Sequence, residues 1–143
     1  SSVLSIEGAQ RLLDDSRAAV SAQDYPLASQ KLQDARQVLN ELSNYHQELA
    51  ASFSGIDNRI FESHRALALQ SAQMRDQATY ELALLYRAQN KPELAVPLLV
   101  QIISSQNPTR ELGKEAYQQL FELGFVESPY PRERGAQPTS NNR

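Results

Sequence analysis

The sequence ATYELALLYRAQNKPELAVPLLVQIISSQNP, residues 78–108, decides the fold. Apolar residues recur in it at helical spacing, first over 78–89 and again over 94–103. Between the two runs, Asn90 suits the left-handed backbone that ends helices, and Pro92 suits a helix start. A break this short predicts two antiparallel helices, whose axes come closest at the small residues Ala83 and Ala95.

Helical periodicity continues towards the N-terminus, so we predict an all-α protein. Ser5 can cap a helix that runs to about residue 22, and a turn at 24–26 leads into a second helix. That helix should extend to about residue 53, because its apolar residues alternate at intervals of four and three, as in a heptad seam. The seam consists of Ala28, Leu32, Ala35, Leu39, Leu42, His46, Leu49 and Phe53. Gly55 should close the helix and Asp57 cap the next one.

The C-terminal part is predicted to contain one more helix and a tail. Thr109 can cap a helix that ends at Gly124. Proline and polar residues dominate from residue 128 onward, which is typical of unstructured chain. We therefore expect a single helical domain over residues 1–125 and a flexible tail over residues 126–143.

The central stretch resembles a tetratricopeptide repeat, a helix pair with a recurring pattern of large, small and aromatic residues. The matching residues are Leu82, Ala83, Tyr86, Ala95, Leu99 and Pro108. Thr79 stands where this family usually has Trp. One fair copy covers about 76–109 and one degenerate copy about 9–42, where Asp15 takes the place of Leu82. An ordinary pair of helices is the alternative. A rival division cuts the long helix at residues 43–44 and finds a third copy in 43–75.

The resemblance implies a short tetratricopeptide-like solenoid or bundle with a long central hairpin and a C-terminal capping helix. In this family the first helix of each repeat lines a concave groove that holds an extended peptide or a partner helix. Carried over by position, the predicted partner-binding residues are Gln77, Tyr80, Leu84, Arg87 and Ala88 in the fair copy and Gln10, Leu13, Arg17, Val20 and Ser21 in the degenerate copy. The family's clamp for a terminal carboxylate uses Lys and Asn, where this chain has Tyr80 and Leu84, so that ligand is not expected.

Composition excludes several other classes of function. The 143 residues carry a net charge of −3, and Lys and Arg are dispersed among acids, so we expect no nucleic-acid partner. The absence of cysteine excludes disulfides and thiolate metal sites. No apolar run is long enough to span a membrane. Apolar residues make up 41% and charged residues 22% of the chain, so we expect a soluble domain. Because the chain begins with Ser and not Met, we expect it to be processed or truncated, which would fit part of an exported or membrane-anchored bacterial protein. The sequence leaves the compartment open.

The two histidines are the only candidate metal ligands with a notable placement. His46 and His64 each lie nine residues from Gly55, so a hairpin that turns there would bring them face to face. Facing imidazoles can bind a metal or respond to pH, because both resist charging together. Without a carboxylate at ligand spacing they make a poor metal site, so we interpret them as structural and predict no metal and no cofactor.

No residue set supports catalysis, and we predict that the chain is not an enzyme. Neither histidine has a nucleophile and an orienting acid at recognisable spacing. The leading hypothesis is a non-catalytic interaction module that binds another protein, as an adaptor, scaffold or assembly factor. The alternative is a structural homo-oligomer in which the seam of residues 28–53 pairs between subunits. A weaker alternative is a metal- or pH-responsive helical bundle that uses His46 and His64.

Overall fold

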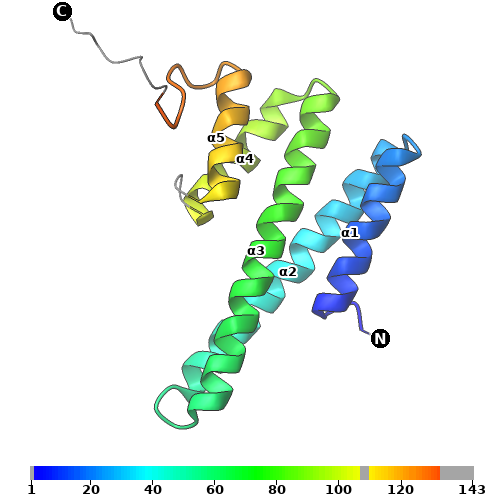
Figure 1. Ribbon diagram of the computed structural model, residues 1–143. Helices are drawn as coiled ribbons and strands as arrows, with labels where there is room; N and C mark the ends of the chain where they lie inside the picture. Colours follow the sequence, from blue (N-terminus) through cyan, green and yellow to red (C-terminus); the bar gives the residue numbers. More distant parts are fainter. Residues whose placement is uncertain (1, 107–109, 133–143) are drawn as a thin grey trace, which may run out of the picture.

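The computed structural model describes residues 2–106 and 110–132, and α-helices make up most of both ranges (Figure 1). Within them the helices are α1 (Ile6–Ser21), α2 (Tyr25–Phe53), α3 (Asn58–Ala88), α4 (Pro92–Gln106) and α5 (Glu111–Glu122). Neither range contains a strand, and the helices pack against one another. The prediction of an all-α protein is confirmed.

Local capping chemistry sets the helix ends. The Ser5 side chain accepts a hydrogen bond from the Gly8 N–H, and the Asp57 carboxylate accepts from the first N–H groups of α3. Asn90 adopts a left-handed φ of 58°, and α4 begins at Pro92, as predicted. The predicted cap Thr109 lies outside the described residues, as does Pro108. Of the predicted tail, residues 126–132 are described and contain no helix.

Helix α2 runs without interruption through residues 43–44, so the rival division into a third repeat is wrong. The apolar seam of α2 continues up to this point, because Leu39 and Leu42 are buried. The neighbouring Ser43 is buried as well, so the helix is packed on both sides of the proposed cut. The seam departs from the prediction near its end. Leu49 is 42% exposed, and Ala50 is buried instead.

Two apolar clusters hold the helices together, and α3 contributes to both. The first joins α1, α2 and α3 around Leu32, Leu39 and Leu82. The second joins α3, α4 and α5 and contains both Ala83 and Ala95, at 1% and 0% exposure. These two alanines therefore lie in the contact between α3 and α4, where the sequence predicted close packing. Small side chains there let two helix backbones approach each other.

The α2–α3 hairpin is the longest feature of the molecule and extends beyond the other helices at its loop end (Figure 1). Helix α1 packs beside its other end on one side, and α4 and α5 pack on the opposite side (Figure 1). Polar contacts also join helices that are not consecutive. Arg17 of α1 pairs with Glu81 of α3, and Arg36 of α2 donates to Gln101 of α4.

Candidate interaction groove

An open, largely apolar groove of about 350 Å³ lies between α1 and α3, with α2 as its floor. Helical spacing produces it from each side. Arg17 and Val20 share a face of α1, and α3 contributes positions 81, 84, 85 and 88. The lining residues are Ser16, Arg17, Val20, Tyr25, Leu32, Glu81, Leu84, Leu85 and Ala88.

Apolar side chains on both walls of the groove are open to solvent. Val20 of α1 is 42% exposed, and Leu84 of α3 is 36% exposed. Leu32 and Leu85 beneath them are buried in the core cluster of α1, α2 and α3. The buried residues of the floor therefore hold the two walls in place. The exposed side chains of Val20 and Leu84 keep apolar surface that a partner could cover.

A bidentate ion pair crosses the groove at its rim. The Arg17 guanidinium donates from Nη2 to Glu81 Oε2 at 2.7 Å and from Nε to Glu81 Oε1 at 3.2 Å. The hydrogen bond to Glu81 raises the pKa of Arg17. Gln77 donates to the same carboxylate at 3.1 Å. Because Arg17 is half exposed, this pair adds little stability, but it links the rim of α1 to the rim of α3.

Helix α5 covers the side of α3 that carries two other predicted partner-binding residues, Tyr80 and Arg87. Tyr80 is only 9% exposed, and its hydroxyl accepts a hydrogen bond of 3.4 Å from Gln119. Burial raises the pKa of Tyr80. Arg87 donates to Gln119 and, at 2.7 Å, to the Glu122 carboxylate. Hydrogen bonds from Gln118 and then Arg87 lower the pKa of Glu122. These contacts attach the last helix to α3.

The structure separates the six leading site residues into three groups. Arg17 and Leu84 line the groove, and Gln77 donates to Glu81 at its rim, so the role of these three residues in partner binding stays a prediction. Leu13 is 2% exposed in the core cluster of α1, α2 and α3, so its assignment to a partner surface is wrong. Tyr80 and Arg87 contact α5, which occupies the face that a partner would need.

Five of the groove residues were not among the predicted partner-binding residues: Ser16, Tyr25, Leu32, Glu81 and Leu85. Tyr25 was placed in a turn, but it opens α2 and forms part of the groove floor. Glu81 belongs to the site only because α3 lies beside α1 in a register that puts it opposite Arg17. The spacing of Gln77 and Glu81, four residues apart on one helix face, was the local signal available for it.

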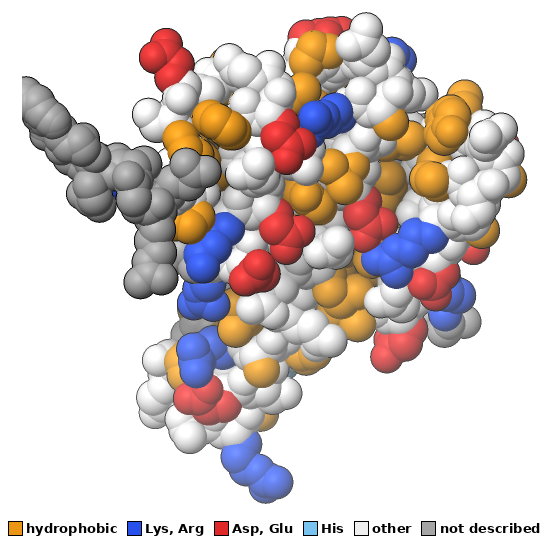
Figure 2. All heavy atoms as spheres, turned by 45° about the horizontal axis from the view of Figure 1, so that its top comes forward, with side chains coloured by type: hydrophobic (Ala, Val, Ile, Leu, Met, Phe, Trp, Pro, Cys, Tyr) orange, Lys and Arg blue, Asp and Glu red, His pale blue; other side chains and the backbone are white. Residues whose placement is uncertain are grey.

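Figure 2 shows one face of the molecule, on which apolar side chains emerge in several places among acidic and basic groups. Acidic and basic side chains both occur over this face, and several basic ones gather along the edge beside the part drawn in grey (Figure 2).

His46 and His64 face each other across the α2–α3 hairpin, as predicted. Their Nδ1 atoms lie 2.9 Å apart, and the rings stack with centroids 5.1 Å apart. At this distance one nitrogen carries the proton and donates while the other accepts. Burial, and then the charge of His64, lower the pKa of His46. In the described ranges no set of three or more histidines and acids could hold a metal ion.

We expect the histidine pair to make the fold less stable in mild acid. The lowered pKa of His46 means that the unfolded chain takes up its proton first as pH falls through about 6.5, so stability falls below that pH. In His46→Gln the amide keeps a polar contact but cannot titrate. The drop in Tm between roughly pH 7.5 and 5.5 should be smaller in this variant than in the wild type.

A matched variant controls for acid effects elsewhere in the chain. Gln47→Ala, on the adjacent exposed position of α2, leaves both imidazoles in place and should keep the wild-type drop in Tm. Equal drops in all three proteins would show that the histidine pair does not contribute to the pH dependence.

Comparison of the chain with models of known protein families, with curated proteins and with solved structures gave no match. The resemblance to tetratricopeptide repeats therefore stays a prediction from the residues quoted above. In residues 2–106 and 110–132 no helix combines the length and apolar character needed to cross a membrane.

Proposed function

We propose that this chain is a non-catalytic protein-interaction module of tetratricopeptide-like design, which holds a peptide or helix of another protein in the groove between α1 and α3. The observation that carries this proposal is the exposed apolar surface of Val20 and Leu84 on two neighbouring helices above a buried floor. Exposed apolar surface that converges from two elements favours a partner with apolar side chains.

The chemistry of the groove supports binding rather than a reaction. Its one acid and one guanidinium, Glu81 and Arg17, are paired with each other. Its one hydroxyl group of a nucleophilic type, Ser16 Oγ, donates to the Leu13 carbonyl oxygen at 2.6 Å inside α1. A partner that inserts apolar side chains between Val20 and Leu84 would meet a charged rim able to bond its polar groups.

Site-specific crosslinking tests the groove directly. A photoreactive amino acid at position 84 should crosslink a discrete partner in cells, while the same amino acid at position 69 should not. Leu69 is a suitable control because it is a 58% exposed leucine on the same helix, away from the groove. Equal products from both positions would mean that the contact is not specific to the groove.

Charge insertion gives the matching loss-of-function test. Leu84→Glu places an uncompensated acid beside Glu81 in an apolar wall, so recovery of the crosslinked partner by pull-down should fall at least about tenfold. Leu69→Glu adds the same charge elsewhere on α3 and should leave recovery unchanged. Circular dichroism should show the same helicity for both variants. A folded Leu84→Glu variant with full recovery would contradict the proposal.

A second candidate, self-association, has one observation in its favour. The loop half of the α2–α3 hairpin exposes Tyr45, Leu49, Ile56 and Leu69, by 42% to 77%. The seam itself is not free for this role over residues 28–42, because it packs within the chain. Sedimentation of the purified protein distinguishes the two ideas, since a monomer at micromolar concentration excludes an obligate oligomer.

A further inference from the structure

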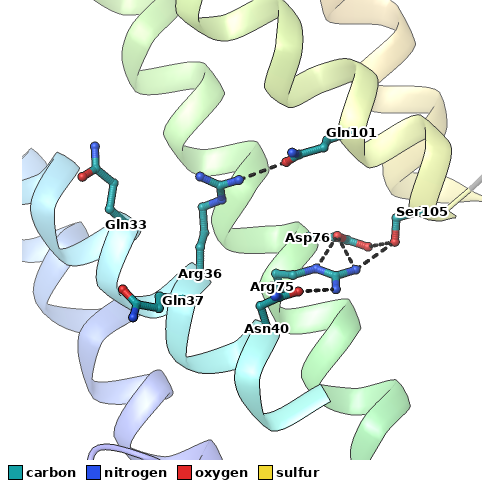
Figure 3. Close-up of a pocket in the computed structure, with 8 residues that line it drawn as sticks. All are labelled: Gln33, Arg36, Gln37, Asn40, Arg75, Asp76, Gln101 and Ser105. Atoms are coloured by element: carbon teal, nitrogen blue, oxygen red, sulfur yellow. Dashed lines mark hydrogen bonds and ion pairs between the residues drawn. The ribbon is translucent and has the colours of Figure 1, made fainter. Parts of the chain in front are cut away.

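A second hollow, of about 460 Å³, lies where α2, α3 and α4 meet, and it shares no residue with the groove. Its lining is polar throughout and contains no aromatic side chain. The lining residues are Gln33, Arg36, Gln37, Asn40, Arg75, Asp76, Gln101 and Ser105. Figure 3 shows Arg36 reaching from α2 towards Gln101 of α4, while Arg75, Asp76, Asn40 and Ser105 form a separate bonded group.

The two guanidinium groups in this hollow are used differently. Arg75 lies 3.1 Å from the buried Asp76 carboxylate, which neutralises it. Arg36 is half-buried and forms no ion pair with a described residue. Two guanidiniums and one carboxylate therefore leave one net positive charge on the lining. A half-buried cation without a counter-ion attracts an anion, because desolvation leaves its charge poorly compensated.

Arg36 is held in place but keeps most of its hydrogen-bonding capacity. Its Nε donates to Thr79 Oγ1 at 2.9 Å, and its Nη2 donates to Gln101 Oε1 at 2.9 Å. Of the five N–H groups of a guanidinium, the other three have no acceptor among the described residues. Burial lowers the pKa of Arg36, and the nearby charge of Arg75 acts in the same direction, while Tyr86 and Asp76 offset part of this effect. An anion placed beside the Arg36 guanidinium would favour its charged form by charge attraction and so oppose this lowering.

The neighbouring amides add further donors. Asn40 Oδ1 accepts from Arg75, and Gln101 Oε1 accepts from Arg36. With their oxygens occupied by guanidinium groups, both side chains retain NH₂ groups as donors. The hollow is therefore rich in donors and positively charged, which suits an acceptor-rich anion.

We propose that this hollow, centred on Arg36, is a binding site for a small oxyanion, a phosphate or carboxylate group carried by a compact polar molecule. The positive charge selects an anion, and the guanidinium and amide donors select oxygen acceptors. The proposal does not depend on the groove between α1 and α3.

Titration calorimetry with sodium phosphate and with citrate, each at constant ionic strength, tests the site. Wild-type protein should give saturable binding with at least one probe, and the tighter one identifies the preferred group. Arg36→Gln removes the cation and should weaken binding about tenfold or more. Arg59→Gln removes the same charge from an exposed position at the start of α3 and should stay within about twofold of wild type.

A second variant tests the site even if Arg36→Gln fails to fold. Gln101→Glu is isosteric and supplies an internal carboxylate to Arg36, so it should abolish anion binding while the helicity is retained. Gln70→Glu adds an equal charge at an exposed position of α3 and should bind like wild type. Absence of saturable wild-type binding to either probe, or equal binding by Gln101→Glu and Gln70→Glu, would overturn the proposal.

Discussion

Leu82→Ala should destabilise the fold by about 2–5 kcal/mol, the range for truncating a fully buried leucine. Leu82 is 1% exposed and packs in the cluster that joins α1, α2 and α3, so its removal leaves a cavity bounded by three helices. These helices are held by side chains on all sides, and the cavity can collapse only in part. Chemical denaturation monitored by circular dichroism measures the change in free energy of unfolding.

Leu69→Ala is the matched control on the same helix. Leu69 is 58% exposed, and the same three carbons are lost from a position already in contact with water. The free energy of unfolding should change by no more than about 0.5 kcal/mol. Similar losses in the two variants would mean that the cluster of α1, α2 and α3 is not the main source of stability.

Asp76→Ala should cost about 2–4 kcal/mol, because it removes the acceptor at the centre of a buried polar network. Asp76 is 4% exposed, and its carboxylate accepts from Ser105 at 2.6 Å, Gln106 at 2.9 Å and Arg75 at 3.1 Å. Ser105 and Gln106 belong to the last turn of α4. Without the acid, the end of α4 loses its attachment to α3, and Arg75 loses its counter-charge.

Asp14→Ala provides the comparison for loss of an acid in general. Asp14 is exposed and lies 3.7 Å from Arg17, so its removal should change the free energy of unfolding by no more than about 0.5 kcal/mol. Asp76→Asn should fall between the two, because the amide keeps an acceptor oxygen but loses the charge. A small loss for Asp76→Ala, similar to that for Asp14→Ala, would contradict a role for this network in holding α4.

The sequence was sufficient for most of the helical architecture. Local signals such as the Ser5 and Asp57 caps and the left-handed Asn90 depend on neighbouring residues alone, and each one predicted a helix boundary that the structure confirms. The equal spacing of His46 and His64 from Gly55 predicted that the two rings face each other, and they do. These features need no knowledge of how distant helices meet.

The candidate sites could be predicted only in part, because they depend on register between helices. Position in a repeat placed Leu13 on a partner surface, but the rotation of α1 against α2 and α3 buries it. Glu81 enters the groove only through its pairing with Arg17, which lies 64 residues earlier in the chain. Arg36 gave no local sign of a site, since its significance comes from α4 bringing Gln101 rather than an acid towards it.

Helix α2 contributes to both hollows, as the floor of the groove and as one wall of the polar hollow. Leu32 faces the groove beside α1, while Gln33 and Arg36, one and four residues later, face the polar hollow beside α4. Because α2 is one continuous helix, a displacement of the residues that line one hollow would extend to the residues that line the other. If a ligand in one hollow shifts α2 and so changes the affinity of the other hollow, linkage requires the second ligand to change the affinity of the first by the same factor, and the two ligands would be thermodynamically coupled without touching.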